Sequence, residues 1–272
     1  MNNTTCRKNQ WHPDRGRASR SQGRALVVTA VLTIAALANA RSSLAQGAQT
    51  NTSKEATVPS EPVLTDRQQA IAPIAAFAAA GDMLGLDAAL NKGLNAGLSI
   101  GDAREILVQL YAYAGFPRSL NALGQLMKVT EARRQQGIQD TPGREPGHAI
   151  PTGDALLAAG TANQTKLVGA PVKGPLFDFA PAIDRFLKTH LFGDIFERDN
   201  LDWQSRELAT VGMLAALSGV ESQLQSHVRI SLNIGLNVAQ LRQLARVLGE
   251  QGNPEAARRV EAALEKVSST GR

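Results

Sequence analysis

The sequence predicts an all-α fold built from two copies of one helical unit. Aromatic residues make up only 4% of the 272 residues, while alanine and leucine are abundant. This composition favours helices over strands, which depend on aromatic and β-branched side chains. In addition, residues 95–99 (NAGLS) recur as residues 233–237 (NIGLN), a spacing of about 138 residues. Such a long period indicates duplication of a helical unit and not a short solenoid repeat.

The first 45 residues predict an export signal. Basic residues up to Arg24 precede an apolar run at 25–40, and small-x-small cleavage candidates follow at 38–40 and 43–45. The run is short for a spanning helix, and no Arg-Arg pair precedes it. We therefore expect Sec-type export, cleavage and a periplasmic or secreted protein without stable membrane insertion. An uncleaved anchor and a mis-set start codon are the alternatives.

The net charge of +5 belongs to this leader, which holds seven of the 29 basic residues but one of the 24 acidic ones. The remainder has a net charge of −1, so the composition gives no reason to expect a nucleic-acid partner. Cys6, the only cysteine, also lies in the leader. The exported part can therefore form no disulfide, no Cys-His metal site and no reactive thiol. No other metal cluster or phosphate-binding glycine loop is visible, so we expect no metal and no cofactor.

Polarity and helical spacing divide the rest of the chain into four parts. A flexible tether at 46–63 precedes a first repeat at 64–136, an irregular connector at 137–177 and a second repeat at 178–268. The first repeat predicts helices at about 67–81, 84–96, 100–114 and 117–136. The second predicts helices at about 179–191, 203–218, 221–234, 238–249 and 254–267. We interpret the connector, which lacks helical spacing, as an ordered wrap-around segment or a functional loop.

Glu207 and His227 are the strongest candidates for catalysis. Glu207 shares a helical stripe with apolar residues such as Val211, and a carboxylate facing a core is costly unless it is paired or protonated. The alternative is a carboxylate stabilised by the helix dipole and Arg206. His227 shares an apolar face with Val228, where a histidine is more often a core residue than a catalyst. The two residues open consecutive, antiparallel helices, so they can approach each other as an acid–base pair.

The first repeat contributes Glu105 and both tyrosines of the chain. Tyr113 comes just before a helix break at 115–117 (GFP), where its hydroxyl can point into a cleft; the alternative is a packing tyrosine. His148 and His190 have no partner visible in the sequence, and we expect them at the surface or in loops.

The chain resembles the carboxymuconolactone decarboxylase family in several runs. These are 206–211 (RELATV), 215–217 (AAL), and His227 followed by 233–236 (NIGL). The run 105–117 (EILVQLYAYAGFP) resembles the second half of that family's pattern, and 192–195 (FGDI) also fits. The resemblance implies an all-α alkyl hydroperoxidase D-like fold, duplicated in long members, and obligate homo-oligomers, commonly trimers. It also implies lactone decarboxylase activity, a lyase reaction.

The alkyl hydroperoxidase D branch of that family reduces peroxides through a Cys-x-x-Cys before the histidine. The corresponding positions here hold Val220 and Gln223 in the second repeat, and Asp82 and Gly85 in the first. The peroxiredoxin activity that the family label suggests is therefore contradicted by the sequence.

One composite site per chain is the resulting hypothesis. The first repeat has Gln68 and Ala89 where the second has Glu207 and His227, but it keeps the tyrosine segment. We predict Glu207, His227, Tyr113 and Glu105 as catalytic residues, and Arg206 and Arg229 as anchors for a substrate carboxylate. The expected chemistry is decarboxylation or isomerisation of a small carboxylated lactone or related organic acid. The alternative is a non-catalytic, oligomeric periplasmic binding protein.

Overall fold

The computed structural model describes residues 63–270, and every regular element in that range is a helix, so the all-α prediction is confirmed. The elements, in chain order, are α1 (Asp66–Ala80), α2 (Met83–Asn95), α3 (Ile100–Gln109), α4 (Tyr111–Gln135), α5 (Gly153–Val168), α6 (Pro175–Phe179), α7 (Pro181–Phe186), the π-helix η1 (Leu187–Ile195), α8 (Trp203–Ala216), α9 (Glu221–Asn233), α10 (Val238–Glu250) and α11 (Pro254–Thr270). None of these helices is long and apolar enough to cross a membrane. The predicted export signal at 1–45 and residues 46–62 of the predicted tether (46–63) lie outside the described residues.

Helices α1 and α8 pack against each other along their lengths and form the centre of the core. Both are buried on nearly all sides, from Ala70 to Ala79 and from Ser205 to Ala215, as expected of helices without a polar face. The backbones come very close at Gly212, where an added Cβ atom would lie 2.6 Å from the carbonyl oxygen of Ala72. This crossing brings the two halves of the chain together.

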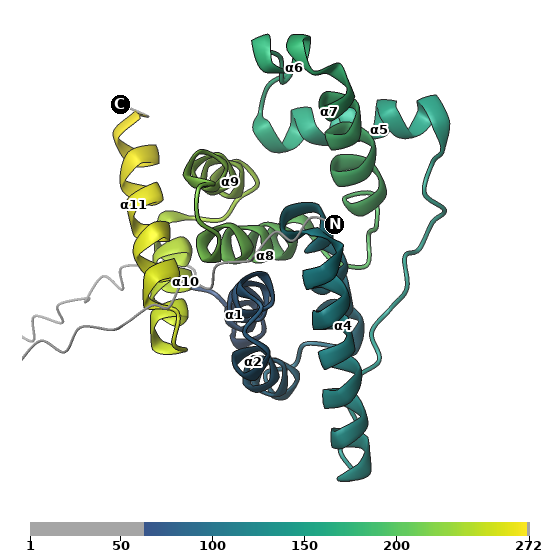
Figure 1. The fold of residues 1–272 in the computed structure, drawn as a ribbon, viewed down its shortest axis with the longest axis vertical. Coiled ribbons are helices and arrows are strands. Elements are labelled where there is room, and N and C mark those ends of the chain that lie inside the picture. The colour runs from purple at the N-terminus through teal and green to yellow at the C-terminus, as the bar shows by residue number, and fades with distance from the viewer. Residues whose placement is uncertain (1–62, 271–272) are drawn as a thin grey trace, which may run out of the picture. The chain divides into compact units, whose positions relative to one another are not determined.

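The remaining helices of each half cover this central pair. Helices α2, α3 and α4 pack around α1, whereas α9 and α11 pack against α8, and α10 packs on α11 and α1 (Figure 1). Helices α3 and α4 also reach α8, so residues of the first half lie beside residues of the second. A site that combines residues of both halves can therefore form at this contact.

The two halves use the same local signals. Ser99 and Asn237 each form a capping box at the start of α3 and α10. Two residues earlier, Gly97 and Gly235 have similar positive φ angles of 91° and 97°. These matches favour the predicted duplication, which stays a prediction.

The helix caps correct one of the predicted equivalences. Thr65 caps α1 and Asp202 caps α8, so Ala70 occupies the position in α1 that Glu207 occupies in α8, and not Gln68. Ala89 and His227 are each the seventh residue of their helices, as expected. The first half thus has two alanines at the positions of the acid–base pair.

The predicted irregular connector at 137–177 contains the helix α5, which the sequence pattern did not reveal. The fully buried residues of α5 are Gly160, Gln164 and Leu167, so this set contains only one large apolar side chain. A hydrophobic periodicity therefore cannot be read from this segment. The prediction of irregular structure was wrong for residues 153–168.

The segment after α7 continues as a π-helix to Ile195, beyond the predicted end at 191. Winding with i→i+5 hydrogen bonds brings Leu187, Leu191 or Phe192, and Ile195 onto one stripe. That stripe packs into a second apolar core with α5 and α9. At the α5–η1 contact the carbonyl oxygen of Lys188 lies only 1.7 Å from where a Cβ atom on Gly160 would be.

Candidate acid–base site

Glu207 and His227 are in direct contact. Asp202 caps α8 by accepting a hydrogen bond from the backbone of Ser205, which fixes the first turn of the helix that carries Glu207. Helix α9 packs against α8 and carries His227. The Nδ1 atom of His227 lies 2.8 Å from Oε2 of Glu207, and both residues are buried. The structure thus brings together the two residues that the sequence singled out.

The contact fixes the tautomer of the imidazole when Glu207 is ionised. A carboxylate only accepts hydrogen bonds, so Nδ1 of His227 donates to it and Nε2 carries the lone pair in the neutral ring. Nε2 has no hydrogen-bond partner among residues 63–270, and the His227 side chain is 10% exposed. The imidazole can therefore accept or release a proton at Nε2.

The second oxygen of Glu207 also lacks a partner within the described part of the chain. Oε1 is buried and accepts no hydrogen bond, although Glu207 is 0% exposed. A buried carboxylate oxygen without a partner is costly, so such an atom points to a ligand or a water molecule at that position.

Tyr113 joins the pair from the first half of the chain. It lies in the first turn of α4, just before Gly115, whose φ of 80° and ψ of 162° break the helix. Its ring meets the imidazole of His227 edge-on, with 5.7 Å between the ring centres. Burial raises the pKa of the Tyr113 hydroxyl, and the negative charge of Glu207 raises it further, against the opposing effects of Thr210 and Arg206. Tyr113 is therefore protonated and able to donate a hydrogen bond.

Two polar residues that sequence reasoning missed hold the tyrosine. Oγ1 of Thr210 lies 3.3 Å from the Tyr113 hydroxyl, and Nε2 of Gln109 donates to Oγ1 of Thr210 at 2.7 Å. Both residues are fully buried. The available signal was spacing: Gln109 follows Glu105 by one helical turn, and Thr210 follows Glu207 by three residues.

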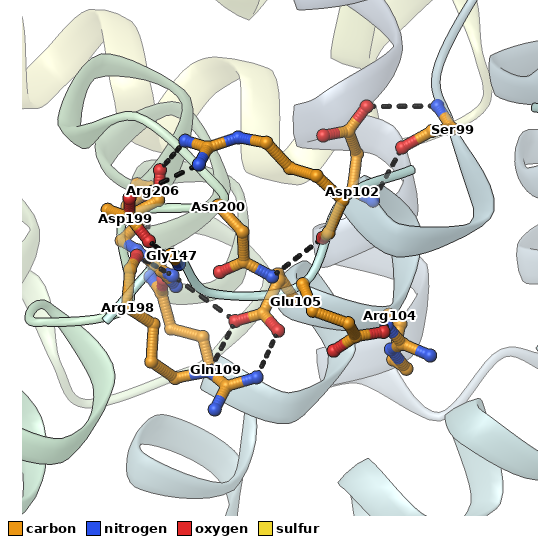
Figure 2. A network of polar contacts seen from close by, with 12 residues as sticks. Ser99, Asp102, Arg104, Glu105, Gln109, Gly147, Arg198, Asp199, Asn200 and Arg206 are labelled. Atoms are coloured by element: carbon orange, nitrogen blue, oxygen red, sulfur yellow. Dashed lines mark hydrogen bonds and ion pairs between the residues drawn. The ribbon is translucent and has the colours of Figure 1, made fainter. Parts of the chain in front are cut away.

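Glu105, predicted as catalytic, lies in a separate ion-pair network (Figure 2). Arg198 donates to both of its oxygens, at 2.8 and 2.6 Å, and Arg206 donates to Oε2 at 3.2 Å. Burial raises the pKa of Glu105, but the hydrogen bonds from Arg198 and Asn200 and the two arginine charges outweigh it, so the pKa falls to about 2. Both oxygens of Glu105 thus accept hydrogen bonds from arginines, and the geometry assigns this residue to the scaffold.

The two predicted carboxylate anchors are not placed to hold a substrate at the imidazole. Arg206 is 0% exposed, and its guanidinium donates to Glu105, to Gln109 and to the Arg198 carbonyl. Arg229 is exposed, but it lies two residues after His227, which puts it on the opposite side of α9. We therefore remove both from the candidate binding residues.

The surroundings of the site are apolar, and little of the imidazole reaches solvent. Tyr113 packs against both cores, the second of which consists of Leu167, Leu191, Phe192, Ile195, Phe196 and Ile230. A groove of about 690 Å³ lies elsewhere, along one side of α5, lined by residues such as Leu157, Thr161 and Lys166. The Glu207 side chain is 0% exposed and the His227 side chain 10%, so the acid–base pair meets solvent only through the imidazole.

The other two histidines in the described range are exposed, as expected. Nδ1 of His190 lies 2.8 Å from Asp194 on the same π-helix, and His148 lies 3.8 Å from Glu197 and 4.0 Å from Asp199. Between residues 63 and 270, no group of three His, Cys, Asp or Glu side chains is arranged to hold a metal ion.

Comparison with known proteins relates part of the chain to one protein family. No curated protein matches the chain. The model of the carboxymuconolactone decarboxylase family matches residues 181–266, whereas the resemblance of the first half stays a prediction. Residues 181–266, which include Glu207 and His227, therefore belong to the carboxymuconolactone decarboxylase family, as the sequence resemblance indicated.

Proposed function

We propose that this protein is a carboxymuconolactone decarboxylase-like enzyme that performs cofactor-free acid–base chemistry on a small lactone or related organic acid. The observation that carries the proposal is the 2.8 Å contact between Nδ1 of His227 and Oε2 of buried Glu207, which leaves Nε2 free. A carboxylate that orients an imidazole in this way fixes the nitrogen that exchanges protons.

Isomerisation requires one proton to move between two carbons. Nε2 of His227 takes the proton from the carbon beside the lactone carbonyl, and the electron pair of that C–H bond becomes the enolate. Glu207 stabilises the resulting imidazolium through Nδ1, and Tyr113 is close enough to donate to the enolate oxygen. Return of the proton to the far end of the conjugated system completes the reaction.

Decarboxylation uses the same groups from the opposite protonation state. Loss of carbon dioxide from the carbon beside the carbonyl leaves its electron pair as an enolate, and imidazolium His227 protonates that carbon. In both reactions, acid–base help of this kind is worth roughly 10²–10⁴ in rate.

The charges around the pair favour isomerisation of a neutral lactone over decarboxylation of a carboxylated one. Glu207 is the buried anion, and both arginines predicted as anchors are placed elsewhere: Arg206 is enclosed by its partners and Arg229 faces the opposite side of α9. A substrate carboxylate beside Glu207 would be repelled without a compensating cation.

The test is the isomerisation of α-angelica lactone, a neutral β,γ-unsaturated lactone, to its conjugated isomer, followed by ultraviolet absorption and by deuterium uptake in D₂O. We expect wild-type turnover, a loss of roughly 10²–10⁴-fold in kcat for His227→Ala, and a smaller loss for Tyr113→Phe. Arg229→Ala, an exposed change on the same helix, is the control and should behave as wild type. Unchanged rates in both His227→Ala and Tyr113→Phe would end the proposal.

A non-catalytic binding protein is the second candidate, and the limited exposure of His227 favours it. A binder would show saturable thermal stabilisation by lactones or organic acids without turnover.

Antioxidant function has no chemical support, because Cys6 is the only cysteine in the chain. Hydrogen peroxide consumption by the purified protein would overturn that exclusion.

Export and oligomerisation complete the proposal. Export to the periplasm rests on the signal-like residues 1–45, and cell fractionation tests it.

Homo-oligomerisation is supported by an exposed apolar stripe on α4, formed by Phe116, Leu120 and Met127 at one-turn and two-turn spacings. Light scattering with size-exclusion chromatography should give a mass of three or more chains.

A further inference from the structure

We infer that Thr210, oriented by Gln109, is a positioning residue that fixes the direction of the Tyr113 hydroxyl proton, so that Tyr113 presents a hydrogen-bond donor to the substrate. This inference rests on the proposed acid–base function and adds the residues that prepare its tyrosine. A chain of hydrogen bonds leads from the ion-pair network of Figure 2 to the tyrosine.

The orientation of the Gln109 amide is fixed by Arg206. Nη1 of Arg206 donates to Oε1 of Gln109 at 3.3 Å, and a guanidinium can only donate. The carbonyl end of the amide therefore faces Arg206, and its NH₂ group faces the other way. Arg206 is itself held by Glu105, so the ion-pair network sets the direction of this amide.

The NH₂ group of Gln109 reaches two acceptors on α8. It donates to the backbone carbonyl of Arg206 at 3.0 Å and to Oγ1 of Thr210 at 2.7 Å. That carbonyl also accepts the helical hydrogen bond from the backbone N–H of Thr210, four residues later. Both lone pairs of the Arg206 carbonyl oxygen are therefore occupied.

The single hydroxyl proton of Thr210 is then directed to Tyr113. Oγ1 of Thr210 lies 3.0 Å from the Arg206 carbonyl and 3.3 Å from the Tyr113 hydroxyl. The first contact is the hydrogen bond to the i−4 carbonyl that helical threonines can make, but this carbonyl already accepts from Gln109 and from the backbone of Thr210. The tyrosine oxygen thus accepts from Thr210, and its own proton points away from Thr210.

This direction defines the substrate that fits. Tyr113 offers one donor, and Nε2 of His227 offers one acceptor beside it, with 5.7 Å between the two ring centres. The matching group is a carbonyl oxygen next to a carbon that carries an acidic hydrogen. The chain is therefore arranged for enolisable carbonyl compounds, of which a β,γ-unsaturated lactone is one.

The test compares Thr210→Val with Thr210→Ser in the isomerisation of α-angelica lactone. Valine has the shape of threonine without the hydroxyl, whereas serine keeps the hydroxyl. Loss of one hydrogen bond in the transition state should lower kcat about tenfold in Thr210→Val with little change in KM, and Thr210→Ser should stay near wild type. In a Tyr113→Phe background, Thr210→Val should have no further effect, because its target is gone.

The opposite proton arrangement makes the opposite prediction. If Tyr113 donated to Thr210, Thr210→Val would free the tyrosine proton, and kcat would stay constant or rise. Either result, or additive losses in the double variant, would overturn the inference. Thermal melts of each variant separate a folding defect from a positioning effect.

A second measurement needs no substrate, so it separates failure of this inference from failure of the proposed function. The chain has only two tyrosines, Tyr111 and Tyr113, so ¹³Cζ labelling gives two resonances that Tyr111→Phe assigns. We expect the Tyr113 resonance to shift in Thr210→Val and in Gln109→Leu, and to stay in place in Thr210→Ser. An unchanged Tyr113 resonance in Thr210→Val would overturn the positioning role even if the lactone is turned over.

Discussion

Two buried glutamates of this protein, Glu105 and Glu207, have opposite environments. The difference assigns Glu105 to the scaffold and Glu207 to the candidate site. Both oxygens of Glu105 accept hydrogen bonds from arginines, which compensate its charge fully. Glu207 has one oxygen on His227 and one oxygen without a partner in the described range. A compensated carboxylate stabilises the fold, whereas an incompletely compensated one is kept for chemistry or for a ligand.

Glu105 should therefore contribute stability that depends on pH. Because folding lowers its pKa from the ordinary 4.5 to about 2, the contribution is complete above pH 4.5 and is lost as the pH falls toward 2. We expect Glu105→Gln to lower the free energy of unfolding by about 3 kcal/mol at neutral pH, and to flatten its acid dependence. Urea unfolding from pH 2 to 7 measures both effects.

The control for this experiment is Glu131→Gln. The pKa of Glu131 is also lowered to about 2, mainly by its hydrogen bond from Arg134, but this pair is exposed on α4. Stability should hardly change, since exposed ion pairs contribute little. Equal effects at the two positions would show that the Glu105 network is no stronger than a surface pair.

The sequence predicted Glu207 and His227 as a pair, but it did not reveal the buried polar residues that hold Tyr113 beside them. Glu207 and His227 stand out because charged or titratable groups on apolar stripes are conspicuous, and consecutive helices bring them together. Gln109 and Thr210 do not stand out, because their roles depend on contacts between the two halves of the chain. Arg206 was misinterpreted for the same reason: its partner Glu105 lies 101 residues away in sequence.

Among the elements, the helices with a strong period or a clear cap were predictable. The starts of α3 and α10 follow from Ser99 and Asn237, which form capping boxes. Helix α5 and the π-helix η1 were not predictable. The buried face of α5 begins with Gly160, which gives no hydrophobic signal, and η1 has the repeat of a π-helix, which a search for α-helical spacing does not detect. Both elements are shaped by their contact with each other.

The α1–α8 crossing predicts that alanine lowers stability at Gly212 but not at Gly124, which lies away from the crossing. A Cβ atom on Gly212 would lie 2.6 Å from the Ala72 carbonyl oxygen and 2.9 Å from its Cα, and backbone atoms cannot rotate away. We expect Gly212→Ala to lower stability by about 1–3 kcal/mol. Gly124→Ala in α4 meets no atom within 4 Å and should stabilise the protein by about 0.5–1 kcal/mol. Thermal melts of both variants test this, and a tolerated Gly212→Ala would contradict the close crossing.

The described part of the molecule has one main core shared by both halves. It runs from Leu64 in the first half to Val267 in the second, and α1 and α8 meet at its centre. The acid–base cluster lies where this core meets the second one, since Tyr113 packs against both. The two halves of the chain therefore bury their apolar faces against each other.

A shared core predicts cooperative unfolding. In scanning calorimetry, the calorimetric and van't Hoff enthalpies of the folded monomer unit should agree, because neither half can unfold while the other stays native. Two separate transitions, with Glu105→Gln shifting only one of them, would contradict this account of how the halves depend on each other.

The 2.8 Å contact with Glu207 places the proton of neutral His227 on Nδ1 and the lone pair on Nε2. ¹⁵N NMR of the histidine side chains over a range of pH tests this assignment without a substrate. We expect the neutral imidazole to carry its proton on Nδ1, with Nε2 showing the shift of an unprotonated nitrogen. A neutral ring protonated on Nε2 would contradict the claim, because the nitrogen that faces the substrate could then not act as a base.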